Sequence, residues 1–269
     1  MAGKISIPDL KRITITDPLF RHYADKVAEK MIPVQWDILN GKGSSRCFCI
    51  DNFRVAAGEL NEKHRGVVFG DTDAYKWLEA VAYCANNGHT DYLPMADELI
   101  ELIGRAQQPD GYLNTYYTVR EPEQRWQNLA EGHELYSAGH LIEAAVAYYE
   151  ATGRRRLLEI AAKFADLICE VFGPREGQKH GYPGHQEIEL ALVKLWRVTG
   201  EPRYLELARY FIDTRGAEPN ELLREMHDPE HHLIFPELLD YDPSYSQSHL
   251  PPVLQTTAEG HAVRAMYQY

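Results

Sequence analysis

Residues 143–173 read EAAVAYYEATGRRRLLEIAAKFADLICEVFG, and residues 189–216 repeat the plan as ELALVKLWRVTGEPRYLELARYFIDTRG. Each stretch consists of an apolar segment that begins at a glutamate, a Thr-Gly pair, an amphipathic segment and a closing glycine. The Thr-Gly pairs, at 152–153 and 199–200, lie 47 residues apart. Because glycine readily takes the left-handed conformation that ends a helix, the repeat predicts a series of helical hairpins.

The two helices of each predicted hairpin differ in how they distribute apolar residues. Residues 188–196 are apolar nearly all round, whereas residues 204–211 carry one apolar stripe and one charged face. A helix of the first kind is buried on most sides, and a helix of the second kind covers it. A third copy spans residues 79–104, with Asn87-Gly88 in place of Thr-Gly. We therefore predict an all-α fold, an α/α toroid of inner and outer helices that forms an incomplete (α/α)6 barrel.

The domain boundaries follow from local breaks in this pattern. Residues 1–20 are expected to form a short extended arm, and residues 21–269 the partial barrel. A first helix is predicted over 21–40, interrupted or ended near Pro33, followed by a loop over 41–50. The chain stops soon after a new inner helix begins, and a toroid needs closure or capping repeats. We therefore expect the barrel to continue beyond this chain.

Composition excludes several classes of protein. The net charge is −12 and no basic stripe is present, which argues against a nucleic-acid partner. No apolar run approaches the roughly 20 residues of a membrane span. The N-terminus lacks the layout of a signal peptide, and four cysteines are too few for a disulfide scaffold, so a cytoplasmic location is expected. Cys47 and Cys49 form a single Cys-x-Cys pair, which we interpret as two thiols on a short strand or loop rather than a metal site.

The histidines carry the clearest functional signal. Five of the 12 follow a glycine, where chance predicts about one. Three of these, His133, His185 and His261, open apolar helices at similar points of the repeat. Since all inner helices run in the same direction, we expect the three rings to meet at one end of the toroid. A helix N-terminus disfavours the imidazolium ion, and a neutral ring offers one donor and one acceptor to a sugar hydroxyl.

Other polar residues receive structural interpretations. His89 is assigned to an outer turn, His140 to helix packing, and the pair His231-His232 to a solvated loop. Carboxylates near the helix starts are explained by the helix dipole alone; they are Glu131, Glu134, Glu187, Glu189 and Glu259. A sugar platform is an alternative for one cluster ahead of the first inner helix, although Asp71 could equally be a helix cap. The members of that cluster are Asp71, Asp73, Tyr75 and Trp77.

Several long motifs together resemble the β-L-arabinofuranosidases of glycoside hydrolase family 127. Among them are RAQQPDGYLNTYY, EGHELYSAGHLIEAAVAYYEATG and QTTAEGHAVRAMY. The segments that carry the resemblance are 66–84, 105–117, 131–153, 181–200 and 258–267. The resemblance implies an (α/α)6 barrel followed by β-sandwich domains, and removal of β-L-arabinofuranose with retention. It also implies that His133, His185 and His261 contact the sugar.

The same resemblance implies chemistry that this chain does not match. In the family a zinc-bound cysteine thiolate is the nucleophile and a glutamate is the acid/base. The zinc ligands belong to a Gly-Glu-Thr-Cys-like segment and a Cys-Cys-Pro-containing segment, neither of which occurs here. We therefore expect no catalytic residue and no metal ligand within the chain, which would represent the N-terminal part of the barrel.

Three functions remain open on the sequence. The first is a glycosidase acting on arabinofuranosides, with this chain as its sugar-binding part. The second is a sugar epimerase or an unsaturated-uronide hydrolase on the same toroid, in which two opposed histidines would act as acid and base. The third is a non-catalytic carbohydrate-binding protein. The last helix is expected to expose an apolar seam, so self-association into a homo-oligomer is also expected.

Overall fold

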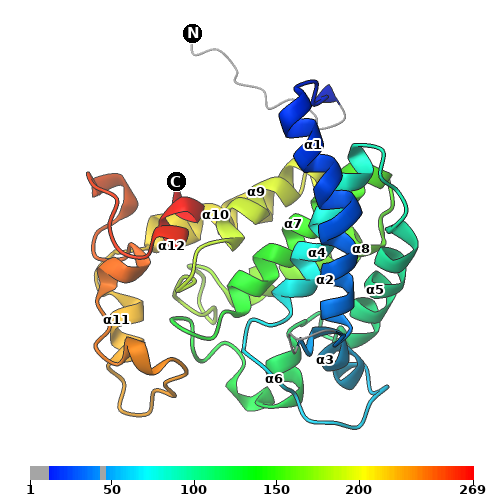
Figure 1. Ribbon diagram of the computed structural model, residues 1–269. Coiled ribbons are helices and arrows are strands. Elements are labelled where there is room, and N and C mark those ends of the chain that lie inside the picture. Colours follow the sequence, from blue (N-terminus) through cyan, green and yellow to red (C-terminus); the bar gives the residue numbers. More distant parts are fainter. Residues whose placement is uncertain (1–11, 43–46) are drawn as a thin grey trace.

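Helical hairpins build the body of the computed structural model, which describes residues 12–42 and 47–269 (Figure 1). In the first hairpin α4 precedes α5, in the second α7 precedes α8, and in the third α9 precedes α10. Their bounds are α4 (Thr72–Asn86), α5 (Leu93–Ala106), α7 (Glu134–Thr152), α8 (Arg156–Val171), α9 (Ile188–Thr199) and α10 (Pro202–Thr214). No β-strand occurs in the part of the chain described, so the all-α prediction is confirmed.

The predicted division into inner and outer helices is also confirmed. Helix α7 packs between α4 and α9, and every residue from Glu134 to Tyr148 is buried. Helix α8 buries a stripe spaced three and four residues apart and leaves its other face in solvent. Helices α5, α8 and α10 form the outer layer over α4, α7 and α9 (Figure 1). The fold is an incomplete α/α toroid.

The Thr-Gly turns have the same structure in both copies of the repeat. Gly153 and Gly200 each adopt φ 75°, the left-handed conformation that ends α7 and α9. The hydroxyl of Thr152 donates to the carbonyl of Tyr148 at 2.6 Å, and Thr199 repeats this bond to the residue four positions earlier at 2.8 Å. The Asn-Gly turn of the first hairpin places its glycine, Gly88, at φ 94°.

The N-terminal segment corrects one expectation and confirms another. Helix α1 (Pro18–Lys26) begins before residue 20, because the Asp17 side chain accepts from two backbone N–H groups and proline at the first position is pre-set for a helix. The arm is thus shorter than expected; residues 1–11 of it lie outside the described residues. The helix is interrupted just before Pro33, as predicted, and does not end there. A π-helical turn, η2 (Val27–Met31), lies between α1 and α2 (Ile32–Leu39).

The expected loop over 41–50 is wrong at its C-terminal end. Helix α3 (Cys49–Ala56) begins there, so Cys49 is the buried first residue of a helix and not part of a strand or loop. Residues 43–46 lie outside the described residues. Helix α3 packs against α5 and against the short α6 (Thr115–Val119). Thr115 at the start of α6 donates to the carboxylate of Asp71, the residue that precedes α4.

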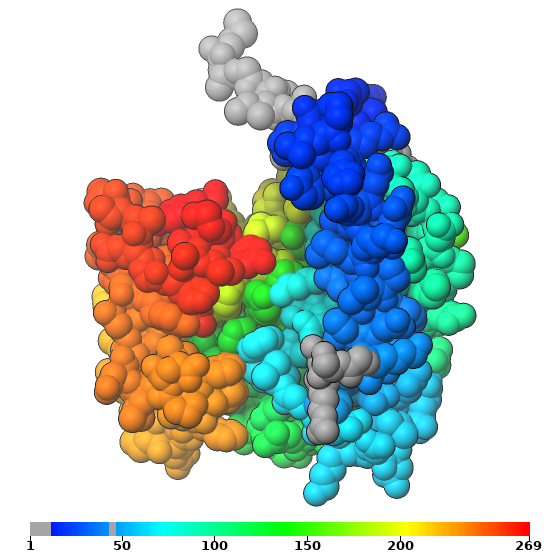
Figure 2. All heavy atoms as spheres, viewed as in Figure 1, coloured from blue at the N-terminus to red at the C-terminus, as the bar shows by residue number. Residues whose placement is uncertain are grey.

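After α10 the chain becomes largely irregular and returns toward the hairpins. It contains α11 (Glu221–Met226) and the short 3-10 turns η4 (Pro236–Leu238), η5 (Pro243–Ser246) and η6 (Pro252–Leu254), and it ends in α12 (Ala262–Gln268). Helix α12 packs against α9 as the next inner helix. Figure 2 shows the surface hollowed between this C-terminal segment, orange to red, and the blue and cyan N-terminal helices.

A close approach between two inner helices, α7 and α9, gives a testable prediction. A Cβ added to Gly139 of α7 would lie 2.8 Å from the backbone nitrogen of Ile188 at the start of α9. Gly139→Ala should therefore force the two helices apart and destabilise the chain by about 1–3 kcal/mol, as overpacking does. Urea unfolding measures this free energy.

Gly104→Ala in α5 is the matched control. Its Cβ would mainly meet the flexible guanidinium of Arg156, and alanine is the better helix former by up to about 1 kcal/mol. Equal stability of the two variants would show that the α7–α9 contact is not tightly constrained.

Candidate functional site

Three histidine rings meet in one pocket. The ring centres of His133 and His185 are 5.7 Å apart, and those of His185 and His261 are 6.0 Å apart. The pocket has a volume of about 270 Å³, near the small end of the range for ligand sites. Aromatic, apolar and charged side chains complete its wall; they are Phe69, Tyr136, Phe235, Glu237, Leu238, Tyr245 and Arg264.

The starts of three inner helices place these rings. His133 caps α7 with φ 54°, a left-handed conformation that is uncommon for a residue with a Cβ. His261 caps α12 in an extended conformation, and His185 lies in the last turn of the loop before α9. The sequence argument placed all three at helix starts, and the structure brings these starts to one end of the toroid.

The glycine before each histidine is required by close packing. A Cβ on Gly132 would meet the carbonyl oxygen of Asn128, and one on Gly184 would lie 2.6 Å from the Cα of Ala130. Gly184 also donates its N–H to the carbonyl of Leu129 at 2.8 Å. A Cβ on Gly260 would meet the backbone of Ser244. Each Gly-His pair therefore marks a point where two backbone segments touch.

Hydrogen bonds fix the tautomer of each ring. Nδ1 of His133 faces the carbonyl of Glu131, and Nδ1 of His185 lies 2.7 Å from the carbonyl of Gln186. A carbonyl only accepts, so both Nδ1 atoms carry the proton and both Nε2 atoms are acceptors. In His261, Nδ1 accepts from the backbone N–H of Arg264 at 3.3 Å, so its Nε2 is the donor. The three rings thus offer two acceptors and one donor.

All three imidazoles are neutral at pH 7. Burial lowers the pKa of His133 to about 4 and that of His185 to about 2, and it also lowers the pKa of His261. The positive charge of Arg264 adds to each shift. Neutral rings were expected from the helix dipole, but burial is the larger cause.

Two histidines outside the triad behave as expected. His89 lies at the outer turn, where its Nε2 is 3.1 Å from Asp25. His140 is buried within α7, and its ring packs 4.5 Å from Tyr136. Tyr136 in turn packs 4.4 Å from His185, so His140 lies directly behind the pocket wall.

The prediction of a solvated loop at His231-His232 is wrong for His231. Its side chain is only 6% exposed, and its Nε2 lies 2.8 Å from a carboxylate oxygen of Glu131. His232 is 60% exposed, as expected. The local sequence does not indicate this burial, because the partner Glu131 lies 100 residues earlier in the chain.

The glutamates near the helix starts have separate roles. Glu131 accepts hydrogen bonds from a distant loop, Glu134 from Tyr112 and the backbone of Trp126, and Glu189 from the buried Arg215. Glu259 is exposed. Glu187 differs from the others. It is fully buried, Nδ1 of His140 is 3.2 Å away, and neither carboxyl oxygen has an aligned hydrogen bond within the described chain.

The alternative of a sugar platform ahead of the first inner helix is not supported. Tyr75 and Trp77 are at most 2% exposed, and Trp77 stacks on Trp36 at 4.6 Å inside the core. Asp71 does not bond to its own helix start. It binds the backbone and hydroxyl of Thr115, which fixes α6. Asp73 is exposed beside Cys47.

The cysteines do not fit a zinc site. Burial raises the pKa of all four thiols, which disfavours the thiolate that binds metal. Sγ of Cys47 lies 3.8 Å from the carboxylate of Asp73. Within residues 12–42 and 47–269 no three His, Cys, Asp or Glu side chains form a cluster that could hold a metal ion. No chemical step is therefore assigned to zinc in this chain.

The fold is a toroid of helical hairpins of the α/α class. At one end it carries a small pocket lined by neutral imidazoles, aromatic rings and an arginine. A family model described as the β-L-arabinofuranosidase, GH127 catalytic domain, matches residues 12–269. The chain belongs to this family, glycoside hydrolase family 127.

Relatives share the sequence and the fold along almost the whole chain. A non-reducing end β-L-arabinofuranosidase of Bifidobacterium longum subsp. longum is 41% identical over 95% of this chain. The crystal structure of a GH127 β-L-arabinofuranosidase from Geobacillus stearothermophilus T6 matches 95% of the chain with a TM-score of 0.90 and 51% identity. A GH127 β-arabinofuranosidase structure matches 97% with a TM-score of 0.82 and 34% identity. The chain covers 42%, 40% and 39% of these three proteins.

Sequence reasoning missed all seven residues that complete the pocket wall beside the histidines. Phe69, Phe235 and Arg264 carry no local pattern that marks them as site residues. Tyr136 was identifiable, because it lies three residues after His133 and therefore on the same face of the helix. Its hydroxyl accepts from the Lys76 ammonium at 2.9 Å, which links α4 to the pocket.

Glu187 gives a prediction with a defined sign. Burial and the nearby Glu143 and Glu79 raise its pKa to about 9. In the unfolded chain it ionises near pH 4.5, so between these values the folded state holds a proton that the unfolded state has lost. Folding stability should then fall as pH rises, by up to about 1.4 kcal/mol per unit.

Glu187→Gln cannot ionise and should lose this pH dependence. Urea unfolding at pH 5 and pH 8 measures the difference, and the exposed Glu176→Gln serves as the control. Parallel pH profiles for the wild type and the Glu187 variant would mean that the carboxyl is ionised in the folded chain.

Proposed function

We propose that this chain is the sugar-binding part of a glycosidase that removes β-L-arabinofuranosyl residues with retention. The observation that carries the proposal is the meeting of His133, His185 and His261, with two Nε2 acceptors and one Nε2 donor, in a pocket of monosaccharide size. Membership of the family and the similarity to a non-reducing end β-L-arabinofuranosidase support it.

The imidazoles would bind and orient the sugar hydroxyls. Two hydroxyls donate to Nε2 of His133 and His185, and a third accepts from Nε2–H of His261. Because the rings are held by buried hydrogen bonds, little entropy is lost when the sugar binds. Orientation of this kind contributes to catalysis only when reacting groups face the anomeric carbon.

The reacting groups implied by the family resemblance would come from outside residues 1–269. A retaining mechanism needs a nucleophile and an acid/base about 5–5.5 Å apart. The four thiols of this chain are buried or half-buried and disfavour the thiolate, and the carboxylates near the helix starts have structural partners or lie behind the pocket wall. We therefore propose that zinc, the thiolate and the glutamate acid/base belong to further parts of the protein.

The pKa shifts disfavour the epimerase alternative. An epimerase would need histidines that gain and lose protons near neutral pH, whereas the pKa of His133 is lowered to about 4 and that of His185 to about 2. The non-catalytic carbohydrate-binding alternative shares the same pocket and differs only in turnover.

Two further proposals concern the state of the chain. Val263 and Met266 of α12 are 49% and 70% exposed, which supports self-association.

The free cysteines support a reducing compartment such as the cytoplasm. No helix within the described residues has the length and apolar character needed to cross a membrane.

The proposal predicts that the chain binds L-arabinose and methyl β-L-arabinofuranoside through the histidine triad. His185→Ala should weaken binding at least about tenfold, since the sugar hydroxyl loses its only ring partner there. Calorimetry measures the affinity, and His89→Ala at the outer turn is the control. Unchanged affinity in the His185 variant would remove the basis for this function.

Turnover distinguishes the enzyme from the binding protein. We expect residues 1–269 alone to hydrolyse no aryl β-L-arabinofuranoside above background, with or without added zinc. A longer form that includes Gly-Glu-Thr-Cys-like and Cys-Cys-Pro-containing segments should hydrolyse it. Comparable rates for the two forms would mean that a carboxylate of this chain acts as a catalytic group.

A further inference from the structure

An aromatic wall faces the histidine triad. Phe69 packs 5.0 Å from the ring of His133, and Phe235 packs 5.7 Å from the same ring in an edge-on arrangement. The two phenyl rings are 6.3 Å apart. Phe69 precedes α4, whereas Phe235 belongs to the loop of residues 231–238, called the lip loop here. The lip loop also supplies Glu237 and Leu238 to the pocket rim.

One buried carboxylate holds the lip loop in place. Glu131 accepts from the backbone N–H of Phe235 at 2.7 Å, from that of Ile234 at 3.1 Å, and from Nε2 of His231 at 2.8 Å. Its own main-chain carbonyl holds Nδ1 of His133. Glu131 therefore fixes both members of one ring contact, the imidazole of His133 through its main-chain carbonyl and the phenyl ring of Phe235 through its carboxylate.

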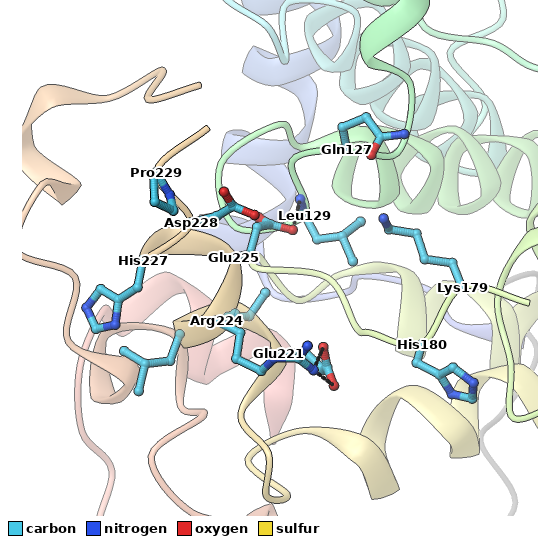
Figure 3. Close-up of a pocket in the computed structure, with 12 residues that line it drawn as sticks. Gln127, Leu129, Lys179, His180, Glu221, Arg224, Glu225, His227, Asp228 and Pro229 are labelled. Atoms are coloured by element: carbon cyan, nitrogen blue, oxygen red, sulfur yellow. Dashed lines mark hydrogen bonds and ion pairs between the residues drawn. The ribbon is translucent and has the colours of Figure 1, made fainter. Parts of the chain in front are cut away.

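The segment that carries Glu131 is itself held from two directions. Asn128 donates to the carbonyl of His232 at 3.0 Å, a second bond to the lip loop. Glu225 of α11 accepts from the backbone N–H groups of Leu129 and Ala130 at 3.0 and 2.8 Å. Figure 3 shows Glu225 directed at Leu129 beside a second, larger hollow. The lip loop is thus a fixed part of the pocket.

We propose that Phe235 is a specificity-determining residue that covers the apolar face of the bound furanose, and that Glu131 positions it. This inference rests on the proposed function. A furanose presents hydroxyls in some directions and C–H groups in others. The imidazoles form hydrogen bonds with the hydroxyls, and the phenyl ring of Phe235 packs against the C–H face. An epimer that turns a hydroxyl toward Phe235 would bury that hydroxyl without a partner, so the ring rejects it.

The experiment compares Phe235→Ala with Leu239→Ala by calorimetry. Leu239 is 72% exposed, lies just beyond the lip loop and does not line the pocket. The probes are methyl β-L-arabinofuranoside and its C2 and C3 epimers as methyl furanosides. We expect Phe235→Ala to lose about tenfold in affinity for the arabinofuranoside and to bind at least one epimer with less discrimination. Leu239→Ala should match the wild type.

Glu131→Ala tests the positioning role. The backbone N–H groups of Ile234 and Phe235 then lose their acceptor, so amide exchange at Ile234 and Phe235 should accelerate and sugar affinity should fall, while amide exchange in α7 stays slow. Faster exchange throughout α7 would indicate general destabilisation and would overturn the positioning role.

The outcomes separate the two proposals. Wild-type protein that binds none of the sugars contradicts the proposed function. Wild-type protein that binds and discriminates, with Phe235→Ala binding and discriminating equally well, overturns only the role of Phe235.

Discussion

Contact between the backbones at Gly184 and at Leu129–Ala130 is the constraint on which the pocket depends. These segments immediately precede α9 and α7, and a Cβ at position 184 would overlap the other backbone. The contact sets the separation of the two helix starts and hence of the His133 and His185 rings. Asn128, Glu131 and Glu225 then attach the later, irregular segment to the same stretch. The contact at Gly184 therefore sets the distance between the N-terminal ends of α7 and α9.

Much of the fold was predictable because it is periodic. Two local signals indicate the 47-residue repeat: the Thr-Gly turn, and the contrast between a helix that is apolar all round and a helix with one apolar stripe. The structure shows both features. The convergence of the triad followed from helix direction alone. Element boundaries, helix phase and distant partners were harder to predict. Helix α1 begins earlier than expected because of the local Asp17 cap. The alternative of a sugar platform fails at Trp77 because its face of α4 points into the core. His231 was predicted to be solvated because its partner, Glu131, is distant in sequence; the fold brings the two side chains together.

Glutamates at equivalent helix starts show why residue type does not settle a role. Glu131 and Glu187 are both fully buried near the pocket. The first is surrounded by donors and holds a loop by hydrogen bonds. The second has His140 at 3.2 Å and no aligned hydrogen bond within the described residues, and burial together with nearby carboxylates favours its protonated form. The two glutamates differ because the fold places hydrogen-bond donors from distant segments beside the Glu131 oxygens but not beside those of Glu187. The sequence near each glutamate does not show this difference.

Arg264 gives the pocket a property that none of its imidazoles has. It is 3% exposed, its guanidinium bonds to the carbonyl of Gly184 and the hydroxyl of Ser246, and within the described residues no carboxylate lies at ion-pair distance from it. Its pKa is lowered to about 10 by burial, so the charge persists at neutral pH. A buried positive charge beside uncharged rings raises the electrostatic potential at this wall of the pocket, and Glu237 is the carboxylate of the same pocket lining. The pocket is therefore electrically asymmetric, and the Arg264 wall favours an electron-rich group of a ligand over a cationic one.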